Sequence, residues 1–367
     1  MRVITGLDLP LGAPGGSVEL LKDLYLGASP RIASDVFMLA TPDRNTVEPP
    51  GGPVLLSVDG KTLDGAGFHT YTDRLTLAVK ARFGTEHYDV AHLQHLTFGA
   101  TPALLRAFPD IPHVAIVHGT DLLFAETHPT QAEVLRSTVA SARVVVVPTT
   151  AMADRLGRLA DAPHVVHIPW GIDDALLASP PEPVPAASGQ LRILYAGRLT
   201  GEKTTSSVLI TLAAQPGVEL SVAAPLHEYA ELSTRCDLTA ARYLGWFARP
   251  ALWREFARQD LLIVPSVTLE AFGLVAVEAQ ACGLPVAYQA VPGLSEVLSD
   301  SALSVDFHSP GALAALVGRL RASPNLLDEL REAGRANSAR FPLSATAKAL
   351  NDLSANLATR QNRRLGG

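Results

Sequence analysis

The sequence predicts an α/β protein with two doubly wound parallel sheets, one in each half of the chain. Short β-branched runs alternate with helical patterns along most of the sequence, which is typical of βαβ units. A proline-dense segment, residues 179–190, interrupts this alternation once, because proline cannot continue either type of element. The chain has 367 residues, too many for a single core of ordinary domain size. We therefore expect two domains joined by a linker.

The first half is expected to form a Rossmann-like domain over residues 1–178, followed by the linker 179–190. Its strands are expected at residues 2–5, 36–40, 90–92, 114–117, 143–147 and 165–168. Its helices are expected at residues 18–26, 73–83, 101–107, 131–140 and 151–159.

The second half is expected to form another Rossmann-like domain over residues 191–343. Its strands are expected at residues 191–196, 219–223, 261–264 and 286–288. Its helices are expected at residues 206–214, 251–258, 275–281, 310–322 and 325–340. Residues 344–367 are expected to form a last helix that returns to the first domain. Because open α/β sheets bind ligands at the carboxyl ends of their strands, the two domains are expected to face each other across a ligand cleft.

Composition narrows the class of protein. No apolar run approaches the ~20 residues that span a bilayer. The N-terminal residues lack the apolar stretch and cleavage site of a signal peptide. The two cysteines, Cys236 and Cys282, are too few for a disulfide framework or a zinc quartet. A reducing cytoplasm is therefore the expected location.

The formal net charge of −6 is unevenly distributed along the chain. The first 189 residues hold 13 Lys and Arg against 20 Asp and Glu, together with nine of the eleven histidines. The sequence has no stripe of basic residues of the kind that binds nucleic acid, and an anionic membrane surface would repel the acidic half. We therefore expect neither a nucleic acid nor a membrane as a partner. The acidity fits a site for a cationic ligand and fits an ordinary solvated surface equally well.

Two glutamates eight positions apart, Glu270 and Glu278, flank the expected start of a helix. Glu270 precedes the helix and can sit at the mouth of a cleft, and Glu278 points along the same face. Between them, Phe272, Gly273 and Leu274 offer backbone N–H groups at a helix N-terminus, which favours phosphate or sugar oxygens. A carboxylate accepts hydrogen bonds from the paired hydroxyls of a ribose or hexose. By itself, this spacing also fits two surface glutamates on an ordinary helix.

A charged, glycine-containing loop follows the expected strand at residues 191–196. Gly197 and Gly201 permit a tight loop, and Arg198 and Lys203 place two cations five positions apart. Two cations at this distance can hold a diphosphate from two sides. Alone, the loop would also fit a solvated turn.

Together these segments resemble the donor-binding domain of glycosyltransferase family 4, whose members are retaining enzymes of GT-B fold. The family has a Gly-Arg-Leu…Glu-Lys-Gly loop, then Pro-Ser, Glu, Phe-Gly-Leu, a second Glu and Ala-x-Gly-x-Pro-Val. The matching residues of this sequence are 197–203, 265–266, Glu270, 272–274, Glu278, 281–283 and 285–286, and residues 292–297 resemble a further family segment. The chain departs from the family at Thr204, where glycine is usual.

The first half resembles the acceptor-binding domain of the same family, with less specific motifs. Gly15 and Gly16 open a helix as the family's glycine-rich loop does. Residues 89–95 resemble its Asp-x-x-His segment, and residues 118–121 resemble its His-Gly-x-Asp segment. Trp170 stands where the family has an asparagine, so the hydrogen bonds of that asparagine are not available here.

The resemblance implies a role for each matching residue on the donor side. Arg198 and Lys203 would neutralise the diphosphate, helped by backbone N–H groups at Gly16 and at residues 272–274. Glu278 would hold the ribose hydroxyls, and Glu270 would hold the transferred sugar.

The remaining roles concern the reacting carbon, the base and the acceptor. His118 would contact the sugar near the reacting carbon, although a lone histidine at a strand end is more often structural. Phe247, with Trp246, would flank the base, although two aromatic residues after a strand are also typical of a core. His95 and Asp121 are the expected acceptor-binding residues.

The expected chemistry uses neither a metal nor a cofactor. No two aspartates lie two positions apart, so the metal-binding Asp-x-Asp motif of other glycosyltransferases is missing. The resemblance implies that Arg198 and Lys203 stabilise the leaving diphosphate instead of a divalent ion. Retention arises most simply by front-face attack, with the leaving phosphate accepting the proton of the acceptor.

The sequence therefore predicts a retaining glycosyltransferase that moves a hexosyl-type sugar from a nucleotide diphosphate sugar, UDP foremost, to a hydroxyl of a small soluble acceptor such as an aminocyclitol. Three alternatives stay open. They are a sugar-nucleotide epimerase of the same fold with Asp121 as its acid/base group, a transferase for a polysaccharide or lipid-linked acceptor, and a non-catalytic binding protein. The oligomeric state is not predicted.

Overall fold

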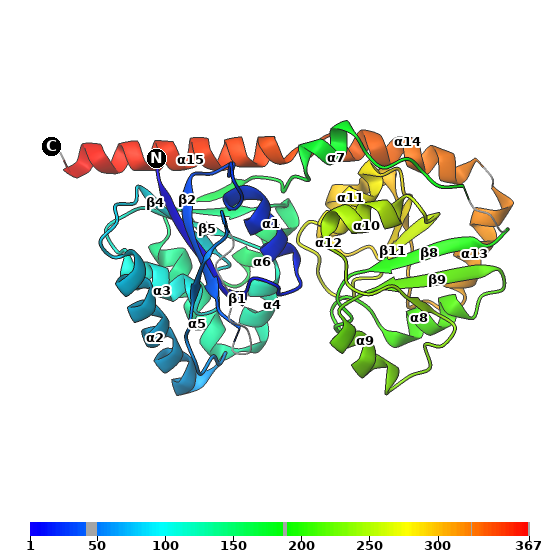
Figure 1. Cartoon of the computed structure of the whole chain (residues 1–367), viewed down its shortest axis with the longest axis horizontal. Helices are drawn as coiled ribbons and strands as arrows, with labels where there is room; N and C mark the ends of the chain where they lie inside the picture. The colour runs from blue at the N-terminus through cyan, green and yellow to red at the C-terminus, as the bar shows by residue number, and fades with distance from the viewer. Residues whose placement is uncertain (42–49, 186–188, 324, 366–367) are drawn as a thin grey trace. The chain divides into compact units, whose positions relative to one another are not determined.

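The computed structural model describes residues 1–41, 50–185, 189–323 and 325–365 (Figure 1). It divides into two compact units, one made of Met1–Pro169 with Ser344–Gly367 and the other of Trp170–Leu343. Residues 170–178, which the sequence analysis assigned to the first domain, group with the second unit. The backbone explains this grouping, because the Ile172 amide donates to the Phe341 carbonyl at 2.9 Å.

The first unit is built on a parallel sheet with the strand order β3-β2-β1-β4-β5-β6-β7. The strands are β1 (Val3–Pro10), β2 (Ser34–Leu39), β3 (Val54–Leu56), β4 (Val90–Gln94), β5 (His113–Ile116), β6 (Val144–Val147) and β7 (Val165–His167). Strand β6 is buried along its whole length, which is why it reads as a continuous apolar run rather than as an alternating one.

Helices connect the strands of this sheet. They are α1 (Gly16–Tyr25), α2 (Gly65–Phe83), α3 (Ala100–Ala107), α4 (Thr120–Thr127), α5 (Pro129–Ser141), α6 (Thr150–Gly157) and the C-terminal α15 (Leu343–Leu365). Helix α2 begins eight residues earlier than the sequence analysis predicts. The prediction missed this start because the first turn contains Gly65 and Gly67, which are poor helix formers. No helix in the described part of the chain is both long and apolar enough to cross a membrane.

The second unit is built on a parallel sheet with the strand order β10-β9-β8-β11-β12-β13. The strands are β8 (Leu191–Ala196), β9 (Val218–Ala223), β10 (Arg242–Tyr243), β11 (Leu261–Val264), β12 (Val286–Tyr288) and β13 (Leu303–Ser304). The helices are α7 (Asp174–Ala178), α8 (Ser206–Ala213), α9 (Leu226–Ser233), α10 (Arg249–Phe256), α11 (Leu274–Ala281), α12 (Pro292–Leu298), α13 (Ala312–Ala322) and α14 (Leu326–Ser338). The predicted α/β class with two parallel sheets is confirmed.

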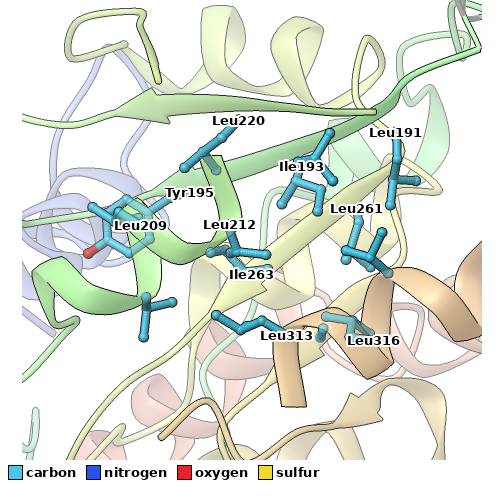
Figure 2. Close-up of a cluster of buried hydrophobic side chains, with 14 of the residues drawn as sticks. Leu191, Ile193, Tyr195, Leu209, Leu212, Leu220, Leu261, Ile263, Leu313 and Leu316 are labelled. Atoms are coloured by element: carbon cyan, nitrogen blue, oxygen red, sulfur yellow. The ribbon is translucent and has the colours of Figure 1, made fainter. Parts of the chain in front are cut away.

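One face of the second sheet packs against α8 and α13 (Figure 2). Leu191, Ile193 and Tyr195 alternate along β8 and all join this cluster, as the two-residue period of a strand requires. Leu209 from α8 and Leu316 from α13 pack against the same cluster. Burial of these side chains fixes β8 at the centre of the sheet, so the residues that follow it start from a rigid element.

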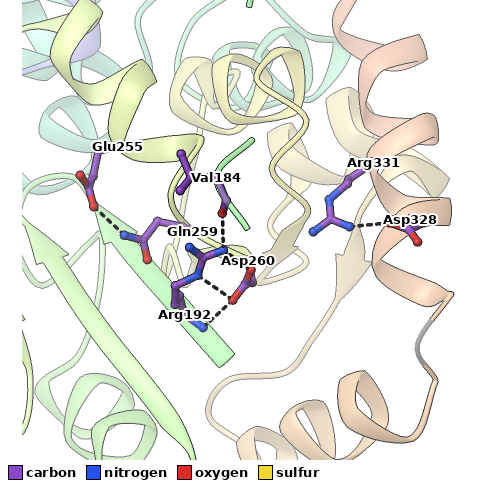
Figure 3. Close-up of polar contacts among 7 residues, drawn as sticks. All are labelled: Val184, Arg192, Glu255, Gln259, Asp260, Asp328 and Arg331. Atoms are coloured by element: carbon purple, nitrogen blue, oxygen red, sulfur yellow. Dashed lines mark hydrogen bonds and ion pairs between the residues drawn. The ribbon is translucent and has the colours of Figure 1, made fainter. Parts of the chain in front are cut away.

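The described part of the predicted linker is anchored to the second unit (Figure 3). The Val184 amide donates to the Ala257 carbonyl at 2.7 Å. The Val184 carbonyl accepts from Arg192 at 3.0 Å, and Arg192 also forms an ion pair with Asp260 at 2.7 Å. The segment therefore lies along the second unit at residue 184.

Helix α15 packs on the first unit through buried polar contacts. Ser354 Oγ lies 2.7 Å from His92 Nε2, and Tyr25 Oη lies 2.8 Å from His92 Nδ1. The Asn351 side chain donates to the Arg31 carbonyl at 3.1 Å. Both ring nitrogens of His92 are thus used to join α1, β4 and α15.

Each sheet reverses its direction of winding once, between β1 and β4 in the first unit and between β8 and β11 in the second. At such a point the connections after the two neighbouring strands leave in opposite directions, which opens a crevice at their carboxyl ends. The segments that follow β1, β4, β8 and β11 are therefore where a ligand site is expected.

Candidate active site

Two loops meet at the winding reversal of the second sheet. One follows β8 and contains Arg198 and Lys203, and the other follows β11 and contains Glu270. The Val267 amide donates to the Glu202 carbonyl at 2.8 Å, which ties the two loops together. Because neighbouring strands hold both loops, residues far apart in sequence converge here.

Arg198 is held by a carboxylate that the sequence analysis did not single out. Its Nε atom donates to Glu228 Oε1 at 2.9 Å, and the Leu199 amide donates to the other Glu228 oxygen at 2.7 Å. Glu228 comes from the first turn of α9. Below the loop, the buried Tyr195 hydroxyl donates to the Arg198 carbonyl. Arg198 and Glu228 are thirty positions apart in the sequence, so no local sequence pattern could predict this ion pair.

Lys203 forms an ion pair with Glu270, the first glutamate of the Glu-x7-Glu pattern. The Glu270 carboxylate also accepts from Ser266 Oγ at 3.1 Å. The structure therefore brings together Lys203, Ser266 and Glu270, as expected from two motifs at the ends of neighbouring strands.

The two cations are accessible to a ligand. The side chain of Arg198 is 43% exposed and that of Lys203 is 38% exposed. Ion pairs at such positions contribute about 0–1 kcal/mol, because solvent screens them. A multiply charged diphosphate can therefore replace Glu228 and Glu270 as their partner at little cost.

The segment between the two glutamates begins α11. Gly273 caps this helix with a φ of 83°, a left-handed conformation that disfavours any residue with a Cβ. The Phe272 side chain is buried and meets the Phe341 ring edge-on, with 5.1 Å between centroids. Gly273 and Leu274, the cap and the first residue of α11, therefore have backbone amides without intrahelical partners.

Glu278 has different surroundings from Glu270. Its side chain is only 3% exposed. One oxygen lies 2.9 Å from Arg249 Nη2, and the other accepts from Trp253 Nε1 at 3.2 Å. The sequence analysis expected Glu278 to point along the same face as Glu270, and in this structure its carboxylate lies against α10. Arg249 and Trp253 belong to no motif that the sequence analysis recognised, so their contacts with Glu278 were not predicted.

The aromatic pair after β10 is partly open to solvent. Trp246 is 45% exposed, and Phe247 is half-buried. An exposed tryptophan is unusual on a protein surface without a partner. The pair therefore fits a surface for a planar group better than it fits a core.

In the first unit, a chain of hydrogen bonds orients His118. Thr5 Oγ1 donates its single proton to the His92 carbonyl at 2.7 Å. The same oxygen can therefore only accept from Gln94, whose Nε2 lies 3.1 Å away. The Gln94 carbonyl oxygen then faces His118 Nε2 at 2.9 Å, so that nitrogen carries the proton. Burial and the neighbouring His95 lower the pKa of His118 well below its usual value. His118 is consequently a neutral hydrogen-bond donor at pH 7.

His95 lies beside His118, with 4.7 Å between the ring centroids. It is buried, and burial lowers its pKa to about 3. Its φ of 77° is strained for a residue other than glycine, and such strain is concentrated at functional sites.

Three buried side chains hold the loop that contains His95. Asp121 accepts from the Leu96 amide at 2.9 Å. Gln131 accepts from the Phe98 amide at 2.9 Å, and Asp8 accepts from the Gly99 amide at 3.0 Å. They come from α4, α5 and β1 respectively. Each of these three backbone amides is therefore satisfied by a side chain from a different element.

Asp121, which the sequence analysis expected to bind the acceptor, also contacts the turn at His118. The residue is fully buried, and its carboxylate also accepts from the His118 amide at 3.2 Å. Burial raises its pKa to about 6. Asp121 therefore braces the loop at residues 95–99 and the turn at His118.

Lys61 is a cation of this region that the sequence analysis missed. Its Nζ atom lies 3.4 Å from Asp8 Oδ2 and donates to the Asp8 carbonyl, and its side chain is 31% exposed. Gly16, the expected amide donor of the first unit, lies at the exposed start of α1. Within the described residues, no group of three or more metal-ligating side chains comes together.

Comparisons with known families agree with the division of the chain into halves. Residues 181–337 match the family model of the glycosyl transferases group 1. Residues 14–176 match the model of Glycosyltransferase Family 4. The two matches together leave out only residues 1–13, 177–180 and 338–367.

Curated relatives with matching segments are D-inositol 3-phosphate glycosyltransferases. That of Segniliparus rotundus is 35% identical over 173 residues, which cover 43% of this chain and 38% of the relative. That of Xylanimonas cellulosilytica is 33% identical over 219 residues, which cover 58% of this chain and 46% of the relative. The chain thus matches less than half the length of each of these relatives.

Solved structures match the chain over nearly its whole length. Sucrose-phosphate synthase of Thermosynechococcus elongatus has a TM-score of 0.81 at 20% identity, covering 98% of this chain and 100% of that one. HepE of Anabaena, solved with UDP and glucose, has a TM-score of 0.77 at 18% identity, covering 97% and 100%. The fold is that of the GT-B class of glycosyltransferases. The chain belongs to glycosyltransferase family 4.

Proposed function

We propose that the chain is a retaining glycosyltransferase that moves a hexosyl-type sugar from a nucleotide diphosphate sugar to a hydroxyl of a small soluble acceptor. The observation that carries this proposal is the convergence of Arg198, Lys203 and Glu270 on the loops after β8 and β11. UDP is the nucleotide we expect, and the HepE structure bound to UDP-glucose supports that choice.

Donor activation follows from the exposed cations. As the bond between the sugar carbon and the phosphate oxygen breaks, negative charge grows on the diphosphate. Arg198 and Lys203 can turn from their carboxylate partners to this charge and stabilise it. Glu270, released from Lys203, can accept hydrogen bonds from the hydroxyls of the sugar. Neither role needs a divalent ion.

The first unit supplies a neutral histidine to the same chemistry. His118 donates its Nε2 proton to the Gln94 oxygen, so it cannot take a proton through that nitrogen. We propose that the proton of the attacking hydroxyl passes to the leaving phosphate as the new bond from oxygen to the sugar carbon forms and the bond from that carbon to the phosphate breaks. Attack from the face that the phosphate leaves gives retention.

A cyclitol is the acceptor class that we propose. The curated relatives are named for D-inositol 3-phosphate, and the acidic first half favours an aminated cyclitol. Lys61 is the feature that favours a phosphorylated cyclitol as a second candidate, because it is a partly exposed cation beside the His95 loop.

A two-stage experiment tests the proposal. Thermal unfolding with UDP-, GDP- and ADP-sugars should identify the donor, since a ligand at about 100 times its Kd adds about 2.7 kcal/mol of stability. Transfer is then measured with the donor found and with aminated, phosphorylated and neutral cyclitols, in the presence and absence of EDTA. We expect transfer with retained anomeric configuration that survives EDTA.

The possible outcomes separate the alternatives. Loss of activity in EDTA with rescue by Mg²⁺ would overturn the metal-free mechanism. Epimerised sugar nucleotide without transfer would favour an epimerase. Preference for a lipid-linked or polymeric acceptor would overturn the choice of a small acceptor. Donor binding without any turnover would indicate a binding protein.

A further inference from the structure

The carboxylate of Glu278 contacts two side chains of one helix, through an ion pair and a hydrogen bond. Arg249 Nη2 lies 2.9 Å from one oxygen, and Trp253 Nε1 lies 3.2 Å from the other. Arg249 opens α10, and Trp253 follows four positions later, so both side chains lie on the same face of that helix. The two helices α10 and α11 therefore meet at a single carboxylate.

All three groups are shielded from solvent. The side chains of Arg249 and Glu278 are 12% and 3% exposed. Trp253 is half-buried. A carboxylate this deep stays charged only with a partner, because burial penalises the ionised form. The guanidinium of Arg249 supplies the compensating charge.

The ion pair on one oxygen and the hydrogen bond on the other restrict the orientation of the carboxylate. Each carboxylate oxygen can accept more than one hydrogen bond, so both can still receive a hydroxyl. A carboxylate with fixed charge and fixed plane suits the two vicinal hydroxyls of a ribose. Helix α10 itself follows the exposed Trp246 and the half-buried Phe247, the surface that fits a planar base.

We infer that Arg249 is a positioning residue that holds Glu278 charged and oriented, and that it thereby sets the preference of the enzyme for ribonucleotides. This inference rests on the proposed function, because it assumes that Glu278 receives the ribose of the donor. Arg249 acts through Glu278, and Trp253 assists by holding the second oxygen.

The test compares nucleotides that differ only in the hydroxyls. Binding of UDP and of 2′,3′-dideoxyuridine diphosphate is measured by titration calorimetry for the wild type and its variants. The wild type should prefer UDP by ~10–100-fold, the range expected for hydrogen bonds to a charged acceptor. In Arg249→Met this preference should fall below about threefold. Affinity for the dideoxy nucleotide should stay within about twofold of the wild type.

Conservative variants keep the test valid if Arg249→Met folds poorly. Arg249→Lys retains the charge and should keep part of the preference. Trp253→Phe removes only the N–H donor and should lower the preference less than Arg249→Met does. Arg254→Met is the matched control, because Arg254 lies exposed on the same helix, and it should leave both affinities unchanged.

A double variant distinguishes action through Glu278 from direct contact. If Arg249 acts through the carboxylate, then Arg249→Met combined with Glu278→Gln should show the same preference as Glu278→Gln alone. An additional loss of affinity for both nucleotides would mean that Arg249 touches the ligand itself and would overturn the inference.

The failure of this inference can be told from failure of the proposed function. A full ribose preference in a folded Arg249→Met variant would overturn the role of Arg249 alone. Wild-type protein that binds none of UDP, GDP and ADP would overturn the proposed function and the inference together.

Discussion

At the residue scale, each of the two cations of the proposed donor site is paired with a carboxylate. Arg198 is paired with Glu228, and Lys203 is paired with Glu270. Such pairs keep flexible cationic side chains in place without strong binding. A diphosphate therefore meets cations that are already aimed at the loop and that can change partners readily.

Lys203→Ala should lower kcat by about 10²–10³-fold, the usual effect of removing a group that stabilises transition-state charge. The change should shift the melting temperature little, since the side chain is 38% exposed. Steady-state kinetics and thermal unfolding check both statements. Lys80→Ala, an exposed lysine on α2, is the control and should retain full activity. Near-normal turnover in Lys203→Ala would contradict the proposed role.

The sequence motif around Asp121 could be recognised, but its hydrogen bonds to the Leu96 and His118 amides could not be predicted from the sequence. Asp121→Asn replaces an acceptor of the Leu96 and His118 amides, so it should lower the free energy of unfolding by about 1–3 kcal/mol. Because the loop at residues 95–99 would loosen, the KM of the acceptor should rise more than that of the donor.

Chemical denaturation and two-substrate kinetics measure these two effects. Asp161→Asn changes an exposed aspartate of the same unit and should alter neither. A stable Asp121→Asn variant with unchanged KM values would show that the loop does not depend on this carboxylate.

At the element scale, the central strands were predictable, whereas of the edge strands only β7 was predicted. Strands β6 and β11 are continuous apolar runs, whose composition alone indicates burial on both faces. Strands β10 and β13 have only two residues each, too few to give a period. The motifs after β8 and β11 could be placed because strand ends were clear. Partners such as Glu228 and Arg249 could not, since they depend on how separate helices pack.

Helix α12 approaches the Glu270 segment so closely that it needs a glycine. A Cβ at position 293 would lie 1.7 Å from the Glu270 carbonyl oxygen. Gly293→Ala should therefore displace the Glu270 segment, lower stability by about 1–3 kcal/mol and weaken donor binding. Gly318→Ala, in the open middle of α13, should be neutral or stabilising. Nucleotide titration and thermal unfolding of both variants check this. Equal behaviour of the two would refute the close contact.

Helix α15 is tied to the first sheet by a histidine that must stay neutral. Burial lowers the pKa of His92 to about 3. The unfolded chain, with a pKa near 6.5, binds the proton more strongly. The contribution of His92 to stability is therefore complete above about pH 6.5 and is lost as the pH falls toward 3.

Comparison with a variant that does not titrate isolates this effect. The difference in the free energy of unfolding between wild type and His92→Gln should shrink by about 2 kcal/mol between pH 7.5 and pH 5. Urea unfolding at both pH values measures it. His87→Gln, at an exposed histidine, should show no such change. A constant difference for His92→Gln would mean that His92 is not neutral in the folded protein.

At the scale of the whole molecule, the chain passes from one unit to the other twice, near residues 169–170 and 343–344. The two passages lie side by side. The Leu343 amide donates to the Ile172 carbonyl at 2.8 Å, and Thr346 Oγ1 donates to the Pro169 carbonyl at 2.8 Å. The second unit is in this sense an insertion into the first.

This insertion sets the order in which the protein can mature on the ribosome. Domains generally fold as they emerge, the N-terminal one first. Here the first 169 residues emerge without α15, so the polar groups that it covers on His92 and at Arg31 stay open to water. All of the second unit, residues 170–343, is synthesised before the last segment of the first unit. The half of the protein that is synthesised first is therefore the half that is finished last.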